Sequence, residues 1–99
     1  MTYKLKFIPT ALKEWNKLGE TLKRAFKKKL SERLENPRIP KDQLHGWQNV
    51  YKIKLRSAGY RLVYEVLDSE VIVIVLAIGK RDNNEVYKNI FKRVGIQDN

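Results

Sequence analysis

The sequence contains no cysteine and only one histidine, His45, among its 99 residues. The first absence excludes a disulfide scaffold, a thiolate zinc site and a cysteine nucleophile. The second excludes a two-histidine acid–base pair and a multi-histidine metal site, while a Ser-His-Asp triad stays open. No segment is long and apolar enough to span a membrane, since the longest run, Val71–Ile78, has the length of a buried strand. The N-terminus lacks the apolar core of a signal peptide, so we expect a cytoplasmic protein with no membrane partner.

The composition is that of a small, strongly basic globular protein. Hydrophobic residues make up 42% and charged residues 32% of the chain, which is typical of a folded domain rather than a disordered one. The length predicts a single domain over residues 1–99. Lys and Arg total 21 against 11 Asp and Glu, which gives a net charge of +10. The expected partner is therefore a polyanion, either nucleic acid or an acidic protein.

The hydrophobic pattern predicts an α+β domain with the element order β-α-α-β-β-β-α. Alternating positions indicate strands over 2–8, 50–56 and 60–67, and an apolar run indicates a strand over 71–78. Helical spacing indicates helices from Pro9 to about Gly19, from about Thr21 to Asn36, and over about 83–94. We expect an antiparallel sheet, with the last strand in its interior, packed by the two N-terminal helices and a C-terminal helix.

The strand over 50–56 and its return strand form the most informative part of the sequence. A two-residue turn at Ala58-Gly59 would pair Arg56 with Arg61 and keep the apolar residues on one face. The opposite face then carries Lys52, Lys54, Arg56 and Arg61, with Glu65, expected opposite Lys52, as the only acid. Like charges set opposite one another destabilise a sheet. This basic face therefore indicates a polyanionic ligand, although such faces also serve solubility.

Other conspicuous residues have ordinary structural interpretations. The run Lys27-Lys28-Lys29 lies on a helix flank near glutamates and fits a solvated surface, although it can also dock on RNA. Trp15 fits the core stripe of the first helix, and Trp47 fits a packing role in its loop. His45 fits an inert surface position better than a phosphate contact. Lys80-Arg81 follows the buried strand, where side chains gather at a sheet end, and strand alternation does not place Arg81.

Several segments together resemble the RelE toxin family of bacterial toxin–antitoxin systems. They are Tyr51-Lys52-Ile53-Lys54-Leu55-Arg56-Ser57-Ala58-Gly59-Tyr60-Arg61-Leu62-Val63-Tyr64, Gly79-Lys80-Arg81, Glu85-Val86-Tyr87, Ala11-Leu12-Lys13-Glu14-Trp15 and Asn36-Pro37-Arg38. The resemblance covers nearly the whole chain. It implies the RelE-like fold and an endoribonuclease that cuts mRNA in the ribosomal A site. It also implies neutralisation by a RelB-type antitoxin, whose complex with the toxin represses its own operon by binding operator DNA through the antitoxin.

The resemblance places the family's functional residues on particular positions of this chain. They are Lys52, Lys54, Arg61, Arg81 and Tyr87. We expect further RNA contacts from Lys27, Lys28, Lys29, His45, Arg56 and Lys80. His45 stands where RelE has an arginine, which predicts a weaker or pH-dependent contact there.

Cleavage of RNA by its own 2′-OH requires a base, charge stabilisation at phosphorus and support for the leaving 5′-oxygen. The basic face has no histidine, so a lysine is the expected base. Neighbouring cations disfavour the charged form of an amine, and Lys54 lies nearest the middle of the cluster. Lys52 and Arg61 would hold the phosphate, Arg81 would stabilise the leaving oxygen and Tyr87 would stack on a nucleotide. The reaction needs no metal and no cofactor.

Two alternatives remain open from the sequence. The chain can be an RNA- or DNA-binding module without chemistry. It can also be an inactive family member that serves only as the partner of an antitoxin, an idea that His45 slightly favours. Turnover separates the first alternative from an enzyme, and growth arrest on expression without antitoxin separates the second.

Overall fold

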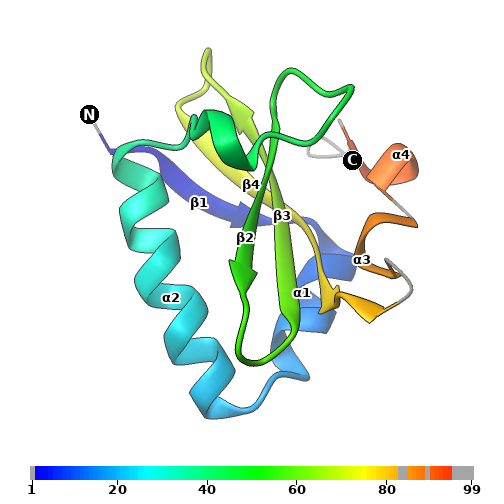
Figure 1. Ribbon diagram of the computed structural model, residues 1–99. Helices are drawn as coiled ribbons and strands as arrows, with labels where there is room; N and C mark the ends of the chain where they lie inside the picture. The colour runs from blue at the N-terminus through cyan, green and yellow to red at the C-terminus, as the bar shows by residue number, and fades with distance from the viewer. Residues whose placement is uncertain (1, 83–84, 89, 95–99) are drawn as a thin grey trace.

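A four-stranded sheet lies at the centre of the computed structural model, which describes residues 2–82, 85–88 and 90–94 (Figure 1). The strands lie side by side in the order β1 (Lys4–Phe7), β4 (Ile72–Lys80), β3 (Tyr60–Leu67) and β2 (Val50–Leu55). The predicted meander β2-β3-β4 is antiparallel, and β4 lies in the interior as expected. β1, however, pairs with β4 in parallel, so the sheet is mixed rather than wholly antiparallel.

Two helices, α1 (Pro9–Asn16) and α2 (Glu20–Glu35), follow β1 and confirm the predicted helical pair. Pro9 stands in the first turn of α1, where a missing N–H costs nothing. The four-residue apolar spacing of α2 places Phe26 and Leu30 in the core. α2 ends before Asn36-Pro37 because the residue before a proline avoids the helical conformation. Trp15 packs as predicted, with its ring 5.4 Å from Phe7 and 6.4 Å from Phe26.

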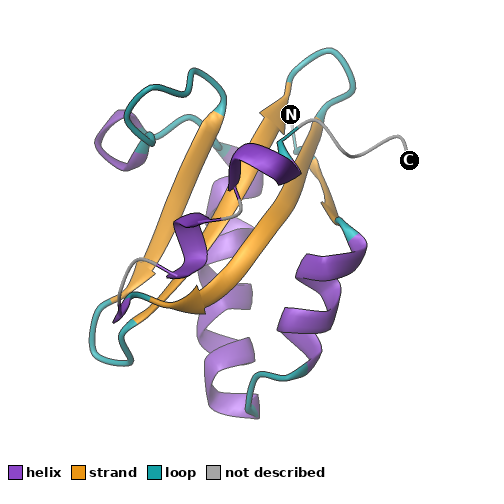
Figure 2. Cartoon of the chain, turned by 90° about the vertical axis from the view of Figure 1, so that its right-hand side faces the viewer, coloured by secondary structure: helices purple, strands orange, loops and turns teal. Residues whose placement is uncertain are grey.

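The C-terminal segment is helical in the described part of the range 83–94, where the sequence predicts a helix. The described residues there form two short helices, α3 (Glu85–Lys88) and α4 (Ile90–Arg93), while residues 83, 84 and 89 lie outside the described part of the chain. Figure 2 shows these short helices on one face of the sheet and the longer helices on the other. Val86 and Ile90 are buried, so the sheet is covered on both faces near β4.

The β2–β3 hairpin is shifted by two residues from the predicted register. Lys54 lies opposite Arg61 and Leu55 opposite Tyr60, so residues 56–59 form a four-residue loop instead of a two-residue turn. The Gly59 N–H donates to the Leu55 carbonyl at 2.9 Å, and Gly59 has a φ of 70°, which glycine adopts without strain. Because side chains alternate with a period of two, this shift keeps every residue of the two strands on its predicted face. Arg56, predicted to pair with Arg61, instead lies in the loop, and Lys54 takes its place.

The prediction for Glu65 is wrong. Glu65 lies opposite Val50, and Lys52 lies opposite Val63. Glu65 is only 7% exposed, so it does not stand on an open basic surface. The longer loop moves the partner of each β2 residue two positions along β3, which carries Glu65 away from the lysines.

β4 continues beyond the end of β1, and two charged side chains occupy the edge left free there. β1 ends opposite Val75. Beyond that point, the Ile78 N–H donates to the Glu14 carboxylate at 3.0 Å, and Arg93 donates to the Leu76 carbonyl at 2.9 Å. Arg93 also forms an ion pair with Glu14 at 3.1 Å. These contacts fasten α1 and α4 to β4. No helix in the described ranges is long and apolar enough to cross a membrane.

Candidate nucleic-acid interface

Three of the predicted functional cations share one face of the β2–β3 ribbon. Lys54 and Arg61 are direct cross-strand partners, and such partners project to the same side of a sheet. Lys52 lies two residues before Lys54 and therefore on that side as well. All three side chains are partly exposed. The structure thus confirms the shared face that the apolar pattern predicts.

Tyr87 borders this face from α3. Val86 of the same helix lies over Gly79, whose cross-strand partner is Arg61. Tyr87 is half-buried, and burial raises the pKa of its hydroxyl, while the charge and hydrogen bonding of Arg61 act in the opposite direction. Tyr87 therefore presents a neutral phenol beside the Arg61 guanidinium.

Arg81 lies at the end of the sheet next to the β2–β3 loop. Its backbone N–H donates to the Gly59 carbonyl at 2.8 Å. A cavity of about 310 Å³ lies here, lined in part by Arg56, Lys80 and Arg81, all exposed. Lys80 pairs with Tyr60, the residue before Arg61. Strand alternation in the sequence does not place Arg81. In the structure, the contact with Gly59 places Arg81 at the loop end of the β2–β3 ribbon, the ribbon that also carries Arg61.

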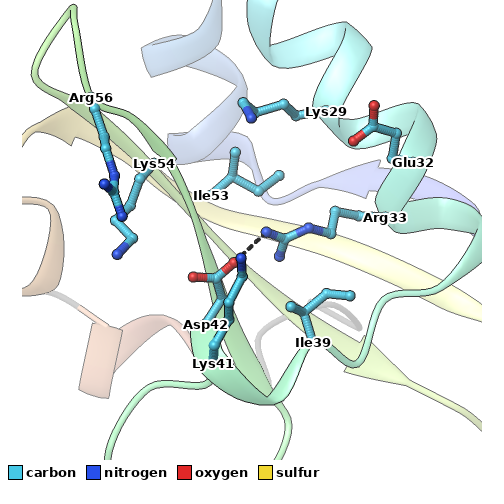
Figure 3. A pocket seen from close by; sticks show the side chains of 9 residues that line it. All are labelled: Lys29, Glu32, Arg33, Ile39, Lys41, Asp42, Ile53, Lys54 and Arg56. Carbon is cyan, nitrogen blue, oxygen red and sulfur yellow. Dashed lines mark hydrogen bonds and ion pairs between the residues drawn. The ribbon is translucent and has the colours of Figure 1, made fainter.

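A buried network that the sequence does not predict fixes the backbone of the lysine-bearing strand. Arg33 of α2 donates to the Lys52 carbonyl at 3.1 Å and to the Tyr64 hydroxyl at 2.9 Å. It also donates to Asp42 at 2.5 Å, the contact that a dashed line marks in Figure 3. Asp42 belongs to a short 3₁₀ segment, η1 (Pro40–Asp42). The Tyr64 hydroxyl in turn donates to the Pro37 carbonyl at 2.6 Å. One guanidinium therefore joins α2, η1, β2 and β3.

The described residues contain no group of three histidine, aspartate or glutamate side chains placed to hold a metal ion. The chemically distinctive feature is a set of cations around an open strand face, with a phenol at its border. Such a set can bind a phosphodiester and stabilise charge that develops on it.

Comparison with known proteins identifies the family. Residues 5–85 match the family model described as the ParE toxin of the type II toxin–antitoxin system. The mRNA interferase toxin RelE of Escherichia coli strain K12 is 54% identical over 94 residues, which cover 95% of this chain and 99% of the relative. The chain belongs to the RelE/ParE toxin family.

Solved structures of RelE agree with this assignment. A mutant of the Escherichia coli toxin RelE in the free state superposes with a TM-score of 0.88 at 53% identity, covering 95% of this chain and 99% of that one. The intact Escherichia coli RelBE toxin–antitoxin complex matches with a TM-score of 0.77 at 56% identity, covering 79% of this chain and 95% of the matched chain. The predicted RelE-like α+β fold is confirmed.

Within this RelE/ParE fold, some of the further RNA contacts expected from the sequence lie away from the basic face. Lys27 borders an apolar hollow with Phe7 and Trp15, on the helix side of the sheet. Lys28 is exposed on α2 and lines none of the cavities described here. His45 is exposed in a tight turn before β2, and Arg56 lies at the other end of that strand. Lys29 alone of the lysine run lines a cavity together with Lys54 and Arg56.

Proposed function

We propose that this chain is a metal-independent endoribonuclease toxin that cleaves mRNA in the ribosomal A site and so halts translation. The observation that carries the proposal is the direct pairing of Lys54 with Arg61 on an open strand face, in a chain 54% identical to an mRNA interferase. A module that only binds RNA needs positive charge. It does not need cations crowded onto one strand pair with a phenol beside them.

The proposed reaction is an in-line attack of the RNA 2′-oxygen on the adjacent phosphorus. Lys54 accepts the 2′-OH proton while the 2′-O–P bond forms. Lys52 and Arg61 stabilise the added negative charge on the phosphorane oxygens. The P–O5′ bond then breaks, and the products are a 2′,3′-cyclic phosphate and a 5′-hydroxyl end.

Arg81 and Tyr87 complete the proposed site. Arg81 stabilises the leaving 5′-oxygen by charge and hydrogen bonding. This oxygen takes its proton from solvent late in the step, and the proton taken up by Lys54 returns to solvent. Tyr87 orients a nucleotide by stacking, for which its neutral ring is suited. No step in this scheme uses a metal ion or a cofactor.

The ribosome supplies what the small protein lacks. A few side chains do not align a flexible RNA strand for in-line attack. The ribosome holds the codon in a fixed position, and such alignment of the reacting groups contributes a large part of the rate enhancement. The surplus positive charge, including Lys27 and Lys28, docks on ribosomal RNA in this proposal, and the exposed His45 adds a further RNA contact. The site of action is then the cytoplasm, and the whole chain over 1–99 acts as one toxin domain.

The proposed regulation of the toxin activity is based on the relatives of this chain. The Escherichia coli toxin has been solved in complex with its antitoxin RelB. We propose that a RelB-type antitoxin neutralises this chain and that the complex reaches operator DNA through the antitoxin and represses the operon.

The test compares binding with turnover on ribosomes programmed with mRNA. Lys54→Ala is expected to lower the cleavage rate at least about 100-fold, the lower range for general acid–base catalysis, and to weaken ribosome binding little. Arg81→Ala is likewise expected to lower cleavage more than binding. Cleavage should persist when EDTA is added at a concentration that leaves the ribosomes intact. Equal losses of binding and cleavage in both variants would indicate a non-catalytic binding module instead.

A further inference from the structure

A second basic site lies at the outer edge of β2, beside the basic face that carries Lys54 and Arg61. It is a cavity of about 510 Å³ between α2, η1 and the edge of β2 (Figure 3). That volume lies within the range of roughly 300–1,000 Å³ typical of ligand sites. Lys54 lines this cavity as well as belonging to the face that carries Arg61. The two sites therefore adjoin at one residue.

The charge of the cavity is strongly positive. Five cationic and two acidic side chains line it, which leaves three positive charges in excess. Arg33 and Asp42 neutralise each other as an ion pair. Among the residues that the structure describes, the remaining cations form no ion pair within the chain; they are Lys29, Lys41, Lys54 and Arg56. Only Glu32 offsets them. Cations left without partners around a cavity of this size suit an anionic ligand.

The lining also indicates which part of an RNA strand the cavity fits. It contains no aromatic residue, and its apolar members are Ile39 and Ile53. Without a ring on which a base can stack, the cavity offers little recognition of bases. Lysine ammonium groups serve as point charges for phosphate oxygens, and such contacts carry no sequence information. The ligand chemistry is therefore that of a phosphodiester backbone.

We propose that this cavity is an accessory phosphate subsite that holds the mRNA strand next to the bond being cut, with Lys29 and Lys41 as its binding residues. The inference rests on the proposed function, which identifies the strand as mRNA. Because Lys54 borders both sites, a strand whose scissile phosphate lies against Lys54 and Arg61 runs directly into the cavity. The subsite binds the strand and takes no part in proton transfer.

The lysine run of α2 is divided by this assignment. Lys27 borders an apolar hollow under β1, and Lys29 enters the cavity beside β2. Successive residues of a helix point about 100° apart, so neighbours in the sequence serve different surfaces. Lys29 contacts the substrate strand in this proposal, whereas Lys27 faces away from it.

The test uses Lys29→Gln/Lys41→Gln and a matched control, Lys4→Gln/Lys6→Gln. Both pairs remove two positive charges from exposed positions, but Lys4 and Lys6 lie on β1, at the opposite edge of the sheet. The first probe is a short single-stranded RNA with 2′-deoxyribose at the scissile position, which prevents cleavage. The second probe is a vacant ribosome without mRNA in the A site. Affinity for each probe is measured over a range of salt concentrations.

The cavity pair is expected to reduce the slope of log affinity against log salt for the RNA probe by about 1.4, or about 0.7 for each lost phosphate contact. The β1 pair should leave that slope unchanged, and both pairs should bind vacant ribosomes alike. Equal effects of the two pairs on the RNA probe would overturn the subsite. So would a loss confined to vacant ribosomes, which would assign these lysines to ribosomal RNA. If the unmodified protein fails to cut mRNA on programmed ribosomes, the proposed function fails, and the RNA-probe result is unaffected because it needs no turnover.

Discussion

Arg33→Met removes the one cation that Asp42, Tyr64 and the Lys52 carbonyl share. The Arg33 and Asp42 side chains are only 14% and 8% exposed. Methionine has a similar length and no charge, so the variant leaves the Asp42 carboxylate largely buried without its cation. The Tyr64 hydroxyl keeps its bond to Pro37, but the Lys52 carbonyl loses its donor from α2.

The expected cost follows from this burial. Removing one partner of a buried ion pair costs about 3–5 kcal/mol. Asp42 is buried but lines the cavity beside β2, from which water can reach its carboxylate, so we expect the lower end, about 3 kcal/mol. In a domain of this size each kcal/mol shifts the melting temperature by about 4–8 °C. The variant should therefore melt roughly 12–24 °C below the unmodified protein.

Urea denaturation followed by tryptophan fluorescence measures the change, and two further variants serve as controls. Arg33→Met/Asp42→Leu replaces the whole pair by apolar side chains and should recover most of the loss. Arg24→Met removes an exposed cation from the same helix and should change the free energy of unfolding by less than about 0.5 kcal/mol. A loss below about 1 kcal/mol for Arg33→Met, or no recovery in the double variant, would refute the reasoning.

Three further predictions concern a strained turn and two tyrosine contacts. Val71 has a φ of 56°, which is strained for a β-branched residue. Val71→Asn should therefore raise the free energy of unfolding by about 1 kcal/mol. Urea denaturation measures this change, and a decrease would contradict the strain. Hydrogen bonds from Tyr3 and Arg38 lower the pKa of Asp68 in the folded protein. The ionised Asp68 carboxylate therefore stabilises the fold fully above its unfolded pKa of about 3.9, and this contribution is lost as the pH falls through the lower pKa of the folded state. The stability difference between Asp68→Asn and the unmodified protein should thus shrink in acid melts, and a constant difference down to about pH 2 would exclude this linkage. Burial raises the pKa of Tyr87, so Tyr87→Phe should keep the shape of the pH–rate profile between about pH 6 and 9, whereas a lost alkaline limb would show that the hydroxyl ionises during cleavage.

The sequence predicts the faces of the elements well because these depend on periodicity. The spacing of Phe26 and Leu30 identifies the buried side of α2, and the alternation of Lys52 and Lys54 identifies the basic side of β2. Register is harder to predict. A shift of two residues keeps every side chain on its face, so the apolar pattern does not distinguish a two-residue turn from the observed four-residue loop.

The hydrophobic pattern of the sequence does not predict contacts that depend on the path of a loop. Arg33 lies on the polar flank of a helix, and nothing near it in the sequence indicates a buried partner. Asp42 reaches it only because the chain turns back at Pro37 and Pro40 and sets η1 beside β2. The same path forms one wall of the cavity that Lys41 lines. The candidate subsite could therefore be found only once the fold was known.

The charged contacts at the free edge of β4 bear on aggregation. Residues 71–78 form an unbroken apolar, largely β-branched segment, the composition that promotes cross-β assembly when an edge is open. β1 protects only the first half of that strand. Over the second half, Glu14 occupies an amide and Arg93 a carbonyl that another chain would otherwise use for pairing. Losing either side chain would open a pairing site on the most apolar strand of the molecule, so we expect resistance to strand-to-strand aggregation to depend on two residues remote from the basic face.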